Sequence, residues 1–225
     1  DGGELRISIP EGVTTIEDHA FYGSPMTVVS LPSTLQTIGD SAFASSWHTS
    51  ITIPASVISI GKDALGFKLT SIEVAAGNTA YCAEDGVLFN IQKTQLVAYP
   101  TMKEGTSYTV PDGVEKLCGY AFCGNEYLTY VELPDTLTYI GEHAFFNVAL
   151  TAVDIPESVK TIGSYAFSGT SLTEVKLPEV FTRIEGGTFY KTGLTEISIP
   201  KWVYYIGQSA FEDTALTNVH IPKGV

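Results

Sequence analysis

Apolar residues recur along this chain with a period of 22 or 23 residues over most of its length. Two β-branched or aliphatic residues, spaced two apart, precede a proline in nearly every period. This spacing puts both side chains on one face of a short strand, and the proline ends the strand because it has no N–H for a ladder. The pattern predicts one strand per period, stacked in parallel along an array. The prolines that set the register are Pro10, Pro32, Pro54, Pro111, Pro134, Pro156, Pro178, Pro200 and Pro222.

More apolar columns follow each proline. After Pro156, for example, come Val159, Ile162, Gly163 and Phe167, and most periods repeat this order. We predict a second, very short strand at the Ile position, followed by a turn in which glycine supplies an open backbone conformation. A short helical turn is then expected to aim the phenylalanine into the core.

A threonine opens nearly every strand, from Thr27 to Thr217. Such a column could form a hydroxyl ladder that binds a glycan or a crystal face. We favour the other interpretation, in which stacked threonine hydroxyls satisfy each other and the turn backbone.

Residues 75–105 interrupt the 22-residue period, and Ala75 stands where proline is expected. Within this insert, residues 87–90 and 95–99 have the character of strands joined by a polar link, which predicts a hairpin. The acidic stretch Glu84–Gly86 is too short for a calcium loop and is interpreted as a turn.

The combined pattern LxxVxLPxxVxxIGxxAFxxxxL resembles the repeats of the BspA-like bacterial surface-protein family, most clearly in residues 150–167 and 194–211. The resemblance covers essentially the whole chain. It implies a leucine-rich-repeat solenoid that is β-rich and right-handed, with stacked parallel strands and short helical turns. We expect a single domain, residues 1–225, that includes the irregular unit at 75–105. The family implies an extracellular or cell-surface location, adhesion to host, matrix or other cell-surface proteins, and no catalytic residues.

Charge and composition narrow the functional classes. Twelve basic and twenty-five acidic residues give a net charge of -13, which disfavours binding to nucleic acid. No apolar run approaches the roughly 20 residues of a membrane helix, so we expect no membrane insertion. The four histidines are scattered and expected to be solvated, and the three cysteines fit neither a disulfide framework nor a zinc site. We therefore predict no enzyme activity, metal or cofactor.

Outward positions on the main strands change character along the chain: they are small and neutral in the first half, and mixed but mainly acidic in the second. We predict that this second part attracts a basic segment of a protein partner, with Tyr130 as an aromatic anchor. The other interpretation of this face is that its stacked charges only keep the sheet soluble. For the whole chain, one alternative is a structural spacer without a ligand of its own. Another is a carbohydrate-binding module, which needs aromatic platforms. The sequence does not indicate an oligomeric state. The candidate residues are Tyr130, Glu132, Asp154, Glu174, Lys176, Glu196 and Asn218.

Overall fold

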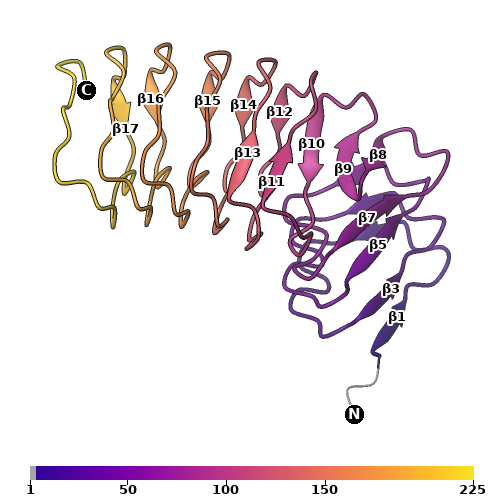
Figure 1. Ribbon diagram of the computed structural model, residues 1–225. Helices are drawn as coiled ribbons and strands as arrows, with labels where there is room; N and C mark the ends of the chain where they lie inside the picture. Colours follow the sequence, from indigo (N-terminus) through magenta and orange to yellow (C-terminus); the bar gives the residue numbers. More distant parts are fainter. Residues whose placement is uncertain (1–3) are drawn as a thin grey trace. The chain divides into compact units, whose positions relative to one another are not determined.

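Short parallel strands, stacked one per repeat, build this protein (Figure 1). The computed structural model describes residues 4–225. The chain forms two compact units that divide after Lys103. Both units have the repeating strand arrangement of a β-solenoid, so the predicted leucine-rich-repeat fold is confirmed.

The first unit contains two parallel ladders, one formed before the prolines and one after them. In the first ladder, β1 (Arg6–Ser8) pairs with β3 (Val28–Ser30), and β5 (Ser50–Ile53) pairs with β7 (Ser71–Val74). In the second ladder, β4 (Thr37–Ile38) lies between β2 (Thr15–Ile16) and β6 (Ser59–Ile60). Both columns of strands were predicted from the apolar spacing.

The insert is an antiparallel meander of β8 (Tyr81–Glu84), β9 (Val87–Asn90) and β10 (Gln95–Ala98). The two predicted strands are confirmed, and the stretch read as a turn joins β8 to β9. Asp85 and Gly86 both have positive φ, 48° and 76°, as a two-residue hairpin loop requires. Strand β8 was not predicted, because it contains no β-branched residue.

The second unit repeats the two columns. Before the prolines, β11 (Ser107–Thr109) pairs with β13 (Tyr130–Glu132). After them, β14 (Tyr139–Ile140) lies between β12 (Lys116–Leu117) and β15 (Thr161–Ile162), while β16 (Arg183–Ile184) pairs with β17 (Tyr205–Ile206). Beyond β13 the first column contains only isolated bridges, Tyr130 to Ala152 and Lys176 to Ser198.

The short helical turns predicted before each phenylalanine are tight turns instead, and residues 4–225 contain no helix. The residue two positions before the phenylalanine has left-handed backbone, as at His143 (φ 54°) and Tyr165 (φ 56°), which a right-handed helix cannot include. Backbone N–H groups here donate to the next repeat, for example from Phe167 to the carbonyl of Thr188 at 3.0 Å. This side of the solenoid is therefore a third inter-turn ladder, called the turn ladder below.

The glycines after the second strand have a different role from the one predicted. None of the five has a positive φ, so an open backbone conformation is not the reason for them. A β-carbon on Gly163 would lie 2.5 Å from the backbone nitrogen of Glu142 in the preceding repeat. Glycine is needed because neighbouring backbones approach closely. The five positions are Gly39, Gly61, Gly141, Gly163 and Gly207.

The phenylalanine column forms a continuous stack in the core of the second unit. The rings of Phe122, Phe145, Phe167, Phe189 and Phe211 lie nearly parallel, with centroids 5.0 to 5.8 Å apart. The first four are fully buried. Stacked rings at this spacing combine area burial with favourable ring contacts, which confirms the predicted inward column.

The threonine hydroxyls bond to the backbone. Thr129 donates to the carbonyl of Thr106 at 3.1 Å, Thr151 to that of Thr129 at 3.1 Å, and Thr195 to that of Thr173 at 3.3 Å. The interpretation in which the turn backbone satisfies these hydroxyls is the one that the structure supports. Among residues 4–225, these hydroxyls bond to backbone carbonyls and not to each other.

Candidate protein-binding face

The two strand ladders of the second unit are interrupted between the same pair of repeats. Within residues 104–225, β15 and β16 are not paired, and no bridge joins residues 151–154 to residues 173–176. The threonine hydroxyl ladder also has a gap between Thr151 and Thr173. The turn ladder continues across this place, from Tyr165 to Gly186 and from Phe167 to Thr188. We call it the opened junction.

Glu185 explains why the ladder opens here. It occupies the position that is glycine in the neighbouring repeats, at Gly163 and Gly207. A β-carbon at those glycines would overlap the backbone of the preceding repeat, and Glu185 carries such a β-carbon. The two backbones cannot approach to hydrogen-bonding distance, so β16 pairs only with β17.

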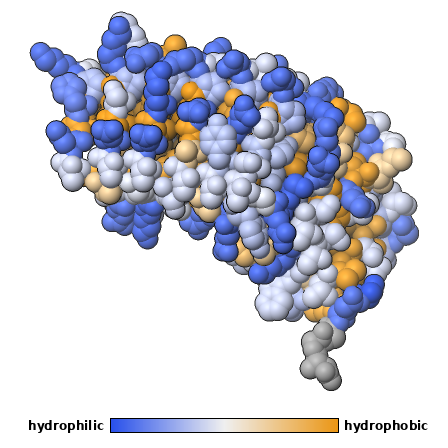
Figure 2. Space-filling view, in the orientation of Figure 1, coloured by the Kyte–Doolittle hydropathy of each residue, from blue (hydrophilic) through white to orange (hydrophobic). Residues whose placement is uncertain are grey.

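A shallow groove of about 580 Å³ lies over the opened junction. Its floor contains Val153 and Val175, which are buried, together with Ile197. The space-filling view shows hydrophobic residues in a row along the C-terminal turns, bordered by hydrophilic side chains (Figure 2). We call this the acidic groove. Its outward residues are Ala152, Asp154, Glu174, Lys176, Glu196 and Ser198.

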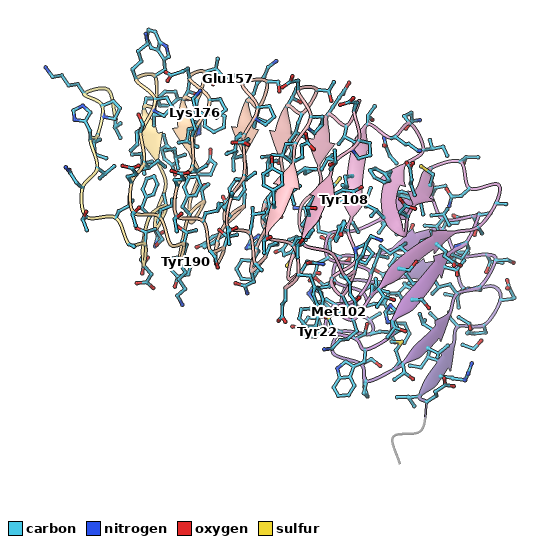
Figure 3. The ribbon with its side chains drawn as sticks, viewed as in Figure 1. Tyr22, Met102, Tyr108, Glu157, Lys176 and Tyr190 are labelled. Atoms are coloured by element: carbon cyan, nitrogen blue, oxygen red, sulfur yellow. The ribbon has the colours of Figure 1, made fainter. Side chains whose placement is uncertain are left out.

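The acidic groove has more negative than positive charge. Asp154, Glu174 and Glu196 face only Lys176, which leaves a net charge of -2. Lys176 also forms an ion pair with Glu157 outside the groove, with Nζ 3.3 Å from Oε1 (Figure 3). Both groups are well exposed to solvent, so the pair contributes little stability and leaves the ammonium able to move.

Tyr130 lies beside the acidic groove rather than in it. Its hydroxyl donates to Oδ2 of Asp154 at 3.5 Å. Burial, together with the charges of Asp154 and Glu132, raises the pKa of Tyr130 above its ordinary value. The phenol therefore remains protonated at neutral pH and acts as a hydrogen-bond donor.

The other predicted residues lie outside the groove lining. Glu132 accepts a hydrogen bond from the hydroxyl of Thr109 at 2.9 Å, one repeat toward the N-terminus. Asn218 is exposed in the last repeat. The structure thus brings together Asp154, Glu174, Lys176 and Glu196, with Tyr130 at the edge.

A second hollow, of about 780 Å³, was missed by the sequence reasoning. It contains the exposed side chains of Val180, Trp202 and Tyr204, beside β16 and β17. The sequence did carry a signal for it, because Trp202 stands at a repeat position that is small or polar in most other repeats. The corresponding residues in three earlier repeats are Gly113, Thr136 and Ser158. We call it the aromatic hollow. Its residues are Glu179, Val180, Thr182, Lys201, Trp202 and Tyr204.

His48 corrects the expectation that every histidine is solvated. It takes the place of the strand-opening leucine and is fully buried. Its Nε2 donates to the carbonyl of Leu65 at 2.7 Å, and its Nδ1 lies 3.0 Å from Oγ of Ser46. Burial lowers its pKa below the usual value, although the bond to Leu65 opposes this shift. Its role is structural.

Other sites for chemistry are scarce in the described chain. Residues 4–225 contain no group of three His, Cys, Asp or Glu side chains that could hold a metal ion. Cys82, Cys118 and Cys123 are partly buried, and burial raises the pKa of Cys118. No helix among these residues could span a bilayer.

Comparison with known proteins agrees with this geometry. The family model described as "BspA type Leucine rich repeat region" matches residues 5–84 and 115–225, in six copies. No curated protein matches the chain.

Three solved structures illustrate the likeness. A leucine-rich cell surface protein from Faecalibacterium prausnitzii is 32% identical, with a TM-score of 0.86 over 96% of this chain and 59% of that one. The pneumococcal vaccine antigen PcpA is 25% identical, with a TM-score of 0.74 over 98% of this chain and 68% of its own. A leucine-rich repeat protein from Eubacterium ventriosum is similar in fold, at 24% identity and a TM-score of 0.72 over 98% and 79%. The present chain thus spans less than two thirds of the first of these proteins.

Proposed function

Because the chain belongs to the BspA-type leucine-rich repeat family, we propose that it is a non-enzymatic module of a bacterial cell-surface or secreted protein, and that it binds a protein partner. The acidic groove is the proposed binding site, and its occupant is a basic, extended segment of a host, matrix or other cell-surface protein. The observation that carries this proposal is the coincidence of the groove with the opened junction.

The shape of the groove supports an extended segment as the ligand. The floor is apolar at Val153, Val175 and Ile197, and the walls carry the carboxylates. An apolar floor with a charged rim is the usual anatomy of a protein interface. Side chains of a bound segment would alternate between the floor and the carboxylates.

Charge supports a basic partner. The net negative charge of the groove is part of a charge of -13 on the whole chain, and a field of this sign steers basic segments and increases their association rate. Such binding should weaken as salt increases, because the Debye length falls to about 3 Å at 1 M.

The test reverses the charge of the groove. Asp154→Lys, Glu174→Lys and Glu196→Lys are combined, and binding is measured against a panel of matrix proteins and a lysine-rich peptide. We expect loss of binding to the partner that the parent chain captures. The matched control is Asp112→Lys, Glu126→Lys and Asp135→Lys, which changes three exposed carboxylates outside the groove. Equal binding by the groove variant and the parent would refute the proposed site.

The spacer alternative predicts a different result. A spacer would bind no member of the panel at low or high salt, and the groove variant would behave as the control does.

A further inference from the structure

The aromatic hollow contains large exposed side chains that the fold does not require. Trp202 is 62% exposed, and Tyr204 and Val180 are each 56% exposed. The residues that correspond to Trp202 in seven of the eight other repeats are glycine, serine or threonine, and the eighth is Val180. Those repeats form the same turn. Exposed aromatic rings in one hollow are typical of a binding site, because rings that stabilise the fold are buried in the core.

Cationic side chains lie over the rings of this region. Nζ of Lys201 is 4.9 Å from the Trp202 ring centroid. Cζ of Arg183 is 4.0 Å from the Tyr205 centroid and 5.9 Å from that of Tyr204, and its Nε forms an ion pair with Glu185 at 2.9 Å. These contacts hold the rings of the two tyrosines near the guanidinium of Arg183.

The charged lining of the aromatic hollow is balanced, unlike that of the acidic groove. Glu179 supplies one carboxylate and Lys201 one ammonium, and neither has an ion-pair partner among residues 4–225. The hydroxyl of Thr182 lies in the same lining. The hollow therefore combines flat apolar surface with hydrogen-bond donors and acceptors, and has no net charge to select an ion.

We propose that the aromatic hollow binds a saccharide, with a neutral pyranose ring stacked on Trp202 and Tyr204. The C–H face of the sugar covers the rings, while its hydroxyls bond to Glu179, Thr182 and Lys201. A few placed polar groups around an apolar platform give a small-ligand site its orientation and specificity. The platform that carbohydrate binding requires is absent from the strand face around Tyr130 and present here. The site is separate from the acidic groove and does not depend on the function proposed for it.

Charge also separates this ligand from other classes. The balanced lining favours neither a highly charged nucleic acid nor a strongly basic peptide. A proline-rich segment could also dock on aromatic rings, and the experiment distinguishes it from a sugar.

Tryptophan fluorescence can report on the site directly. The chain has two tryptophans, Trp47 and Trp202, which are similarly exposed at 57% and 62%. In a Trp47→Phe variant, Trp202 is the sole indole. We expect neutral hexose and N-acetylhexosamine oligosaccharides, screened as an array and then titrated individually, to shift its emission and protect it from acrylamide quenching. The matched pair of binding variants is Trp202→Ala and Trp47→Ala, both tested by calorimetry with the oligosaccharide that scores highest.

The outcomes are separable. The proposal expects Trp202→Ala to weaken saccharide binding at least about tenfold and Trp47→Ala to leave it unchanged. It is overturned if no oligosaccharide protects Trp202 at millimolar concentration, if both variants lose binding equally, or if a proline-rich decapeptide protects Trp202 and the sugars do not. The variant with three reversed groove charges should retain saccharide binding, which keeps this test independent of the protein-binding proposal.

Discussion

The ring of Tyr165 lies over Gly187 of the next repeat, in the space that a side chain at residue 187 would need. A β-carbon added to Gly187 would overlap Cε1 of Tyr165. Tyr165 is held there by stacking on His143, with ring centroids 5.2 Å apart. Gly187 also has left-handed backbone, with φ at 62°.

Gly187→Ala should therefore destabilise the second unit for two reasons. Left-handed backbone costs a residue with a β-carbon about 1–2 kcal/mol, and overpacking against Tyr165 adds about 1–3 kcal/mol. Gly113→Ala is the control, because Gly113 has φ at 92° but nothing within 4 Å of the added carbon. Urea unfolding should show a larger loss for Gly187→Ala, and adding Tyr165→Ala should recover part of it. Equal losses at the two glycines would contradict this account.

Glu185→Gly should close the opened junction. Without the β-carbon, β15 and β16 can approach, and each backbone hydrogen bond gained contributes about 0.5–1.5 kcal/mol. Hydrogen exchange should report slower exchange of the backbone amides of residues 182–185. Glu179→Gly controls for loss of an exposed glutamate at a position outside the ladder. If the amides of residues 182–185 exchange at the parent rate, another feature keeps the junction open.

Phe167→Ala should cost about 3–5 kcal/mol, since it leaves a cavity between two stacked rings. Its ring is fully buried, 5.2 Å from that of Phe145 and 5.8 Å from that of Phe189. Because repeats stabilise their neighbours, exchange protection should fall on both sides of residue 167. Phe67→Ala is the comparison, because Phe67 is 44% exposed and should cost little. A parent-like unfolding midpoint for Phe167→Ala would mean that the column is not the core.

His48 should make the protein less stable as the pH falls. The pKa of His48 in the folded chain is below the value of 6.5 expected when unfolded. As pH falls through 6.5, the unfolded state takes up the proton first, so stability is full above this pH and falls toward the lowered folded-state pKa. His48→Gln removes the titration while keeping a donor for the Leu65 carbonyl.

The measurement compares urea midpoints of parent and His48→Gln between about pH 7.5 and about pH 5.5. The parent should lose more stability on acidification than the variant does. A parallel decline in both proteins would show that other groups dominate this range.

The apolar columns predicted the fold because each column corresponds to one structural position in the repeat: the first strand, the second strand or the core phenylalanine. Two apolar residues spaced two apart before Pro156 were enough to predict the strand. Phe167, eleven residues after this proline, was enough to predict the turn and the core position. The left-handed turns were not predictable in this way. His143 and Tyr165 are not glycines, and bonds to the next repeat maintain their backbone conformation.

The candidate site was predicted only in part. The alternation of outward residues brought Asp154, Glu174 and Glu196 to one face. The opened junction depends on how closely two backbones approach, and the sequence signalled it only through the departure at Glu185. The aromatic hollow was missed because Trp202 and Tyr204 lie outside the strand positions that were considered.

The continuous turn ladder has a mechanical consequence. Across the opened junction, the backbone hydrogen bonds between the repeats lie along the turn ladder, from Tyr165 to Gly186, from Phe167 to Thr188 and from Gly169 to Tyr190, beside the phenylalanine stack. On the other side, within residues 104–225, only the side chain of Glu157 joins the two repeats by hydrogen bonds, through Lys176 and the N–H of Glu179. Tension along the second unit would thus be borne there by the turn ladder, without the two strand ladders that share the load between neighbouring repeats. The acidic groove lies over the same junction, so a bound ligand and a force along the second unit would act on the same pair of repeats.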